Sequence, residues 1–262
     1  MDANTQLTNE SFLGANGGLA DYLIVEAGNA RRIPDNMSLE LAGKWHHYRA
    51  MMSKVESTKT HTVETALVEP LAVGWHAVRT HVPHGCSSAL VIGAGPIGLA
   101  IVQALRARGV ETIILADTNS AKKDYASRAG AQHFINSLEE DVVLSCVKFA
   151  RGGAGVQFAF DTAGKQATLD QCVGSLRVGG TVVNLAIWGG SASVMPNAFT
   201  LGEKKYSGSA VYVEKDFDEV ISAISTGNFE LLPTQKHTLT SKLRRHRSGL
   251  HGDIEDRVGR FC

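Results

Sequence analysis

The chain has 262 residues, of which 44% are hydrophobic and 20% are charged, so it can form one large or two smaller soluble domains. Its 26 Lys and Arg residues balance 26 Asp and Glu residues, and no net charge draws it to nucleic acid or to an anionic membrane. This balance argues against a nucleic-acid-binding or membrane-surface protein and favours a small-molecule ligand.

The N-terminus and the cysteines indicate a cytoplasmic protein. Residues 1–10 have neither the basic start nor the apolar core of a signal peptide. The longest apolar stretch, residues 89–102, contains three glycines and a proline and is shorter than the roughly 18 residues of a membrane span. The four cysteines are far apart in the sequence, which argues against a disulfide framework and a structural zinc site: Cys86, Cys146, Cys172 and Cys262.

Short β-rich and irregular segments are predicted before the main pattern. Residues 19–25 form an expected strand between glycine turns, and residues 33–36 close this region, which is too small to bury its own face. Residues 43–63 are polar and lack a steady period, which predicts an exposed loop or a frayed helix. Residues 65–81 have apolar side chains at helical spacing, and Pro70 is expected to interrupt that helix.

From residue 89 onward, short apolar strands alternate with helical segments. The expected strands cover residues 89–92, 112–116, 134–135, 156–160, 181–185 and 206–211. The expected helices cover residues 97–108, 120–129, 139–149, 166–176 and 216–226. This alternation predicts βαβ units, an α/β fold and a doubly wound parallel sheet.

A glycine-rich segment joins the first of these strands to its helix. The segment Gly93-Ala-Gly-Pro-Ile-Gly98 directly follows an apolar strand and opens a helix, which is the arrangement of a dinucleotide-binding Rossmann fingerprint. Gly93 would permit the tight turn, Gly95 would let the backbone approach the pyrophosphate, and Gly98 would let the helix pack closely. Pro96 and Ile97 complete the predicted phosphate-binding loop at the helix N-terminus.

Asp117 ends the next strand and is the expected partner of the adenosine ribose. It lies 117 − 98 = 19 residues after Gly98, the spacing of an acidic acceptor for the 2′-hydroxyl. A carboxylate there would repel a 2′-phosphate, so NAD is predicted rather than NADP. Lys122 and Lys123 oppose this preference but fall in the following helix, and a simple helix cap is the alternative role for Asp117.

Two further segments lie where strands of a parallel sheet end. Asp161 and Thr162 follow the fourth strand, and Ala186 and Ile187 follow the fifth. Ligands bind at the carboxyl edge of such sheets, so these four residues are candidates for lining the nicotinamide half. Ordinary turn chemistry is the alternative for each.

Two segments of the sequence resemble the medium-chain zinc-dependent alcohol and polyol dehydrogenases. They are LVEPLAVGWHAV at residues 67–78 and VIGAGPIGLA at residues 91–100. The 2,3-butanediol dehydrogenase branch is the most similar, with the sorbitol dehydrogenases next, and the resemblance covers most of residues 12–42 and 65–243. It implies NAD-dependent, zinc-assisted oxidation of a vicinal diol or secondary alcohol to the ketone.

The zinc ligands of that family are mostly missing from this sequence. In that family the catalytic zinc is held by an early Cys, a Gly-His-Glu segment and, in this branch, the Glu of a Glu-Pro motif or a water that this Glu contacts. Of these groups only Glu69 is present here. One carboxylate cannot supply three protein ligands, so we predict a vestigial Glu69, no bound catalytic zinc and impaired catalysis. The histidines lack a chelating arrangement and are expected to be solvated or buried in the core: His46, His47, His76, His81 and His84.

The resemblance also implies a domain organisation. Residues 1–42 correspond to a remnant of the GroES-like β-rich catalytic domain, and residues 64–227 correspond to the Rossmann NAD-binding domain. Residues 43–63 form an irregular insert, and residues 228–262 form a return segment with a divergent tail. We interpret the insert and the tail after Leu243 as unspliced or misread sequence, and the chain as N-terminally truncated.

Three functions are compatible with these features. The first is a truncated butanediol or polyol dehydrogenase with weak or absent activity. The second is a zinc-free enzyme of the quinone-reductase type, in which the cofactor alone donates hydride, although Glu69-Pro70 belongs to the zinc branch. The third is a non-catalytic dinucleotide-binding module that forms a homodimer through a sheet edge at residues 183–187 and 206–211.

Overall fold

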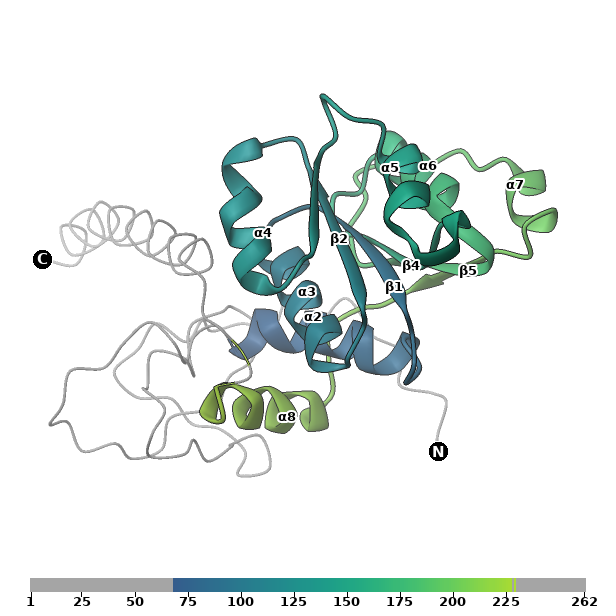
Figure 1. Ribbon diagram of the computed structural model, residues 1–262. Helices are drawn as coiled ribbons and strands as arrows, with labels where there is room; N and C mark the ends of the chain where they lie inside the picture. The colour runs from purple at the N-terminus through teal and green to yellow at the C-terminus, as the bar shows by residue number, and fades with distance from the viewer. Residues whose placement is uncertain (1–67, 228, 230–262) are drawn as a thin grey trace, which may run out of the picture. The chain divides into compact units, whose positions relative to one another are not determined.

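The computed structural model describes residues 68–227 and Phe229 (Figure 1). The chain divides into two units, Met1–Glu69 and Pro70–Cys262, and nearly all of the described residues belong to the second unit. The predicted strand at residues 19–25, the insert at residues 43–63 and the tail lie outside the described residues. The described residues therefore cover most of one predicted domain, the one at residues 64–227.

Six parallel strands form one sheet in the described part of the chain. They are β1 (Ser88–Ile92), β2 (Thr112–Asp117), β3 (His133–Asn136), β4 (Val156–Asp161), β5 (Leu176–Asn184) and β6 (Lys205–Gly208). Their order is β3-β2-β1-β4-β5-β6, and every pairing is parallel. This is the strand order of a doubly wound Rossmann sheet, whose direction of winding reverses between β1 and β4. The predicted α/β class and parallel sheet are confirmed.

The helices alternate with these strands. They are α2 (Val68–His81), α3 (Pro96–Ala107), α4 (Lys123–Ala129), α5 (Val142–Phe149), α6 (Gln166–Ser175), α7 (Pro196–Thr200) and α8 (Glu214–Ser225). Two short 3-10 helices, η4 (Ser120–Lys122) and η5 (Arg151–Gly153), lie between them. None of the helices in the described residues is long and apolar enough to cross a membrane.

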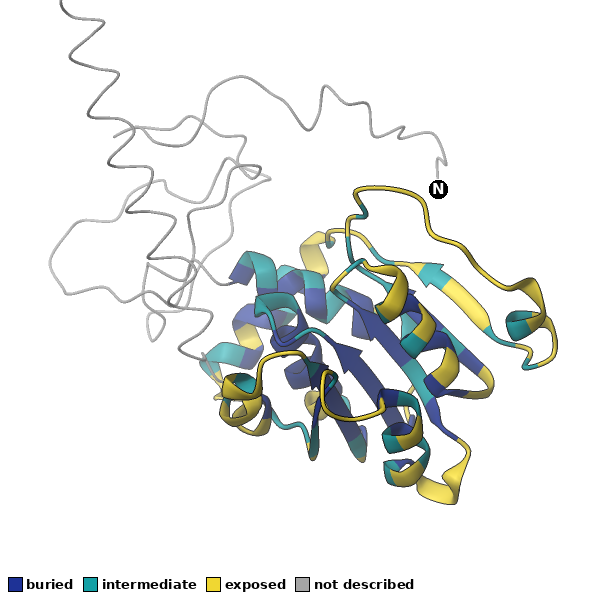
Figure 2. Ribbon diagram, turned by 90° about the horizontal axis from the view of Figure 1, so that it is seen from above, coloured by how far each residue is buried: buried dark blue, intermediate teal, exposed yellow. Residues whose placement is uncertain are grey.

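The central strands are buried on both faces because helices cover both sides of the sheet, toward which successive side chains point alternately. On β1, Ala89 and Val91 belong to one core cluster, which includes residues of α2, α3 and α4. Leu90 and Ile92 belong to the other, which includes residues of α5 and α6. Figure 2 shows the buried central strands between helices whose outer surfaces are exposed. The continuous apolar runs in the sequence reflect this burial on two sides.

Helix α3 begins at the dinucleotide motif and is deeply buried. Gly95 is its N-cap, and Pro96, the first helical residue, has a backbone φ angle already suited to the helix. All residues from Gly98 to Leu105 are buried. Helix α2 packs closely against α3, since a Cβ added to Gly74 would lie 2.8 Å from the Ala100 Cβ atom.

Several element boundaries differ from the sequence predictions. Pro70 does not interrupt α2, because it lies in the first turn, where its missing N–H group has no partner to lose. The predicted helix at residues 120–129 is divided into η4 and α4. The predicted strand at residues 206–211 ends at Gly208, after which Val211 has a left-handed φ of 51°. Helix α7 was not predicted.

Candidate dinucleotide-binding site

The loop between β1 and α3 requires glycine at two positions. Gly93 has a φ of 105°, and a Cβ there would lie 2.4 Å from the Thr162 Oγ1 atom. A Cβ added to Gly98 would lie only 1.8 Å from the Gly93 carbonyl oxygen. The first glycine therefore permits the turn and the last lets α3 begin directly against it, as the sequence predicted for a tight strand-to-helix connection.

Gly95 is different, because the space that a side chain would occupy at this position is open. No heavy atom lies within 4 Å of a Cβ built on this residue, and its φ of −78° is ordinary for any amino acid. It forms the N-cap of α3, and no side chain caps the helix. The free N–H groups and the partial positive charge of a helix N-terminus attract a phosphate. Gly95 therefore leaves open the space through which a pyrophosphate would approach.

Asp117 lies at the end of β2 and binds the glycine loop. Its Oδ2 atom accepts a hydrogen bond from the Ala94 N–H at 2.7 Å, and its Oδ1 atom accepts one from the Asn119 N–H at 2.9 Å. Asn119, not Asp117, caps the short helix η4 by accepting from the Ala121 N–H. The structure thus places Asp117 beside the loop, and the alternative role of a helix cap belongs to Asn119.

Lys122 is a residue of the site that sequence analysis did not assign. It lies in η4, before α4 begins, and its Nζ atom donates to the Ala94 carbonyl oxygen at 2.9 Å. Asp117 and Lys122 therefore bind the N–H and the carbonyl oxygen of the same loop residue, Ala94. The position of Lys122 five residues after Asp117 was the only sequence signal for this role. The turn at η4 brings its side chain back to the glycine loop.

Asp161 ends β4, and Thr162 follows it beside the glycine loop. The Asp161 side chain is fully buried, and its Oδ1 atom accepts from the Ala163 and Gly164 N–H groups at 2.9 and 3.1 Å. Its Oδ2 atom has no hydrogen-bond partner among the described residues. The Thr162 hydroxyl donates to the Ile92 carbonyl oxygen at 2.8 Å. Both side chains form the turn chemistry considered as the alternative, and their contact with a nicotinamide stays a prediction.

Ala186 and Ile187 lie beyond the end of β5. Ala186 donates its N–H to the Asp161 carbonyl oxygen at 3.2 Å, whereas the Ile187 side chain is 100% exposed. Asn184, which sequence analysis did not single out, holds this segment through its side chain. It donates to the Ala186 carbonyl oxygen at 3.0 Å and accepts from the Trp188 indole at 3.1 Å. An amide at the carboxyl end of a buried strand was the signal for it.

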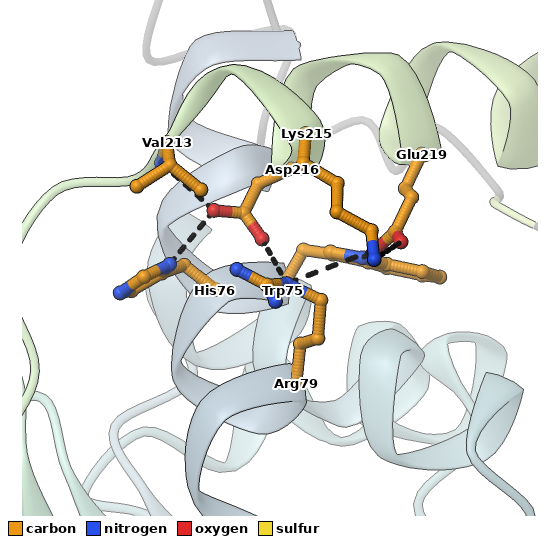
Figure 3. Close-up of polar contacts among 7 residues, drawn as sticks. All are labelled: Trp75, His76, Arg79, Val213, Lys215, Asp216 and Glu219. Atoms are coloured by element: carbon orange, nitrogen blue, oxygen red, sulfur yellow. Dashed lines mark hydrogen bonds and ion pairs between the residues drawn. The ribbon is translucent and has the colours of Figure 1, made fainter. Parts of the chain in front are cut away.

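The described residues do not fit the family's zinc site. Glu69 lies in the first turn of α2, and residues 68–227 contain no group of three His, Cys, Asp or Glu side chains that could hold a metal. His76 is occupied, since its Nδ1 atom lies 2.7 Å from the Asp216 Oδ2 atom (Figure 3). Burial lowers the pKa of His81 and raises the pKa of Cys146 to about 11, so that thiol is protonated at neutral pH.

The comparisons with known proteins agree with this fold. The family model described as zinc-binding dehydrogenase matches residues 96–226, which is half of the chain. A probable diacetyl reductase ((R)-acetoin forming) of Saccharomyces cerevisiae is 31% identical over 91% of this chain. An (R,R)-butanediol dehydrogenase of the same yeast is 30% identical over 90% of the chain.

A solved structure of a butanediol dehydrogenase is also similar to this chain. The 2R,3R-butanediol dehydrogenase from Bacillus subtilis has a TM-score of 0.62 and 28% identity, covering 77% of this chain and 50% of that one. The chain spans 52% and 57% of the two yeast relatives, about half of their length. On the family match and the shared parallel sheet, the chain belongs to the zinc-binding medium-chain dehydrogenase family.

Proposed function

We propose that this chain binds NAD(H) at the carboxyl edge of its sheet, with the pyrophosphate over Gly95. The observation that carries this proposal is the open space at Gly95, at the uncapped N-terminus of α3, next to a loop whose Ala94 N–H is held by Asp117. Phosphate charge is stabilised at such a helix terminus, and the acid accepts from the ribose hydroxyl.

The proposed preference for NAD over NADP rests on the balance of two charges. Asp117 would repel the 2′-phosphate of NADP. Lys122 opposes it, but its Nζ atom is engaged by the Ala94 carbonyl oxygen at 2.9 Å. Because the carboxylate belongs to the strand end that the ribose faces in this fold, its repulsion is expected to dominate.

The proposed reaction is that of the relatives, interconversion of a vicinal diol or secondary alcohol and its ketone, with catalysis impaired in this chain. Their names specify butanediol and diacetyl as substrates. Among the described residues, Glu69 is the single group of the family's zinc site, and no metal cluster accompanies it. Small neutral alcohols are the proposed ligands, and neither nucleic acid nor a membrane is a proposed partner.

Fluorescence titration and turnover assays on the full chain test both parts. We expect saturable NADH binding with a dissociation constant of about 1 μM to 1 mM, the usual range for enzyme ligands. NAD⁺ with 2,3-butanediol, or NADH with diacetyl, should give no turnover, whether or not Zn²⁺ is added. Absence of NADH binding would contradict the site, and zinc-dependent turnover would contradict impaired catalysis. NADH oxidation by benzoquinone would favour the zinc-free quinone-reductase function.

A second candidate function is dimerisation through the sheet edge. Strand β6 pairs only with β5 in the described sheet, and Tyr206 on it is 49% exposed. The prediction that residues 183–187 also form this edge was wrong for residues 183 and 184, because β5 pairs with both β4 and β6. An unpaired edge strand can pair with that of a second copy. Light scattering after size exclusion should give twice the 28.0 kDa chain mass, and Tyr206→Lys should reduce the dimer. A monomer at all concentrations would contradict this function.

A further inference from the structure

A buried carboxylate joins helix α8 to helix α2 (Figure 3). The Asp216 side chain is 0% exposed, and its Oδ1 atom accepts from the Arg79 Nε atom at 2.5 Å. Its Oδ2 atom interacts with the His76 Nδ1 atom at 2.7 Å and accepts from the Val213 N–H at 2.8 Å. One side chain therefore binds two residues of α2 and the backbone residue at which α8 begins.

A second acid of α8 strengthens the same junction. The Glu219 Oε2 atom accepts from the Trp75 indole at 2.6 Å and lies 3.9 Å from the Arg79 Nε atom. Lys215 lies 3.7 Å from the other Glu219 oxygen, one helical turn away. Figure 3 shows these side chains between the two helices, with Trp75, His76 and Arg79 on α2 facing the acids of α8. Positive and negative side chains alternate along the contact between α2 and α8. These pairings form in one alignment of the two helices.

An ion pair with a buried carboxylate adds little net stability to the contact between two helices. Removing a carboxylate from water costs free energy that its partners only partly return, and well-packed apolar side chains often give equal stability. Polar contacts differ from apolar ones in that they specify a geometry. The cluster around Asp216 therefore selects a particular placement of α8, beginning at Val213.

The segment before Val213 lies at the carboxyl edge of the sheet. The Ser209 N–H donates to the Asn184 carbonyl oxygen at 2.9 Å, and the Asn184 side chain donates to the Ala186 carbonyl oxygen. Within this segment Val211 has a φ of 51°, a strained conformation for a β-branched residue. Strained residues persist where surrounding contacts hold them, commonly at binding sites.

The other side of the junction leads to the phosphate-binding helix. Gly74, one residue before Trp75, packs on α3 so closely that a Cβ would lie 2.9 Å from the Ile101 backbone nitrogen. A continuous set of contacts thus runs from α3 through α2 and Asp216 to the residues 209–213 segment. This packing anchors α2 on the core of the domain, so the contacts of Asp216 hold residues 209–213 relative to that core.

We propose that Asp216 is a positioning residue, which through His76 and Arg79 holds residues 209–213 in the arrangement that the nicotinamide half of a bound dinucleotide requires. This inference rests on the proposed function. Asp216 does not touch the glycine loop, so the adenosine and phosphate half should be insensitive to it.

Binding of two ligands to the full chain tests the proposal. NADH carries the nicotinamide, whereas ADP-ribose lacks it, and calorimetry gives both affinities. Asp216→Asn keeps the size of the side chain but removes the charge that Arg79 and His76 face. We expect it to weaken NADH binding about tenfold and ADP-ribose binding by less than about twofold. Asp218→Asn, an exposed acid on the same helix, is the matched control and should change neither affinity.

The outcomes are distinct. Equal weakening of both ligands, or no change in NADH affinity, would overturn the positioning role and leave the dinucleotide site intact. A wild-type chain that binds neither ligand would overturn the proposed function and this inference with it. If Asp216→Asn does not fold, His76→Gln removes one partner and leaves Arg79 in place. That variant should weaken NADH binding about threefold with ADP-ribose unchanged, and an unchanged NADH affinity would refute the proposal.

Discussion

The open side of Gly95 makes a sharp prediction for the variant Gly95→Ala. The residue already has a φ of −78° and a ψ of 179°, which alanine adopts without strain, and the added methyl group meets no atom within 4 Å. Loss of glycine flexibility in the unfolded chain should then stabilise the fold by about 0.4 to 1 kcal/mol. The free energy of unfolding should not decrease.

Dinucleotide affinity should change in the opposite direction. A pyrophosphate bound to the N–H groups at the start of α3 must approach the backbone at hydrogen-bond distance, and the methyl group would occupy that space. Loss of one hydrogen bond to the charged phosphate costs about 1.5 to 3 kcal/mol of binding free energy. This corresponds to a roughly tenfold to hundredfold loss of affinity.

Two measurements on the same protein sample separate these effects. Urea denaturation gives the free energy of unfolding, and NADH fluorescence titration gives the dissociation constant. Gly190→Ala is the matched control, because that glycine also has open space around it and an unstrained φ. A Gly95→Ala chain that binds NADH like wild type, or that loses more than about 1 kcal/mol of stability, would contradict the role assigned to Gly95.

Three other variants have defined outcomes. Gly98→Ala should destabilise the fold by about 3 kcal/mol, because its Cβ would lie 1.8 Å from the Gly93 carbonyl oxygen, and an unchanged urea midpoint would contradict this. Asp117→Asn should raise NADPH affinity relative to NADH, since the charge that repels a 2′-phosphate is removed while Lys122 stays in place; competition titration with both dinucleotides measures the ratio, and an unchanged ratio would show that Asp117 does not discriminate. For Asp216, burial alone would raise the pKa, but hydrogen bonds from Arg79, the Val213 N–H and His76 together lower it below the ordinary value. A lowered folded-state pKa stabilises the fold above the unfolded pKa of about 3.9, and this stabilisation is lost as pH falls through the folded value. The stability difference between wild type and Asp216→Asn should therefore shrink below about pH 4, and a difference that grows on acidification would contradict the assignment.

The sheet could be predicted because its signal is local. Strands buried on both faces are continuous apolar runs, such as Ala89-Leu-Val-Ile92, and each is followed by a helical pattern. The glycine fingerprint and Asp117 were found the same way, since their spacing along the chain follows from the strand, loop and helix that they join.

Contacts between distant segments could not be predicted from the sequence. Asp216 and His76 are 140 residues apart, and no local pattern pairs an acid in a late helix with a histidine expected to be solvated or buried alone. Lys122 was placed in a regular helix, but the 3-10 turn at η4 directs it back to Ala94. The end of β6 was also misplaced, because Val211, a good strand former, takes a left-handed conformation that the loop imposes.

Hydrogen exchange of the full chain with and without NADH tests the cofactor site most directly. Peptides that contain residues 93–98 and Asp117 should exchange more slowly when NADH is bound, because the free N–H groups at the start of α3 become hydrogen-bonded to phosphate. Saturable NADH binding that leaves these peptides unprotected and slows exchange in other segments would contradict the placement of the dinucleotide at Gly95.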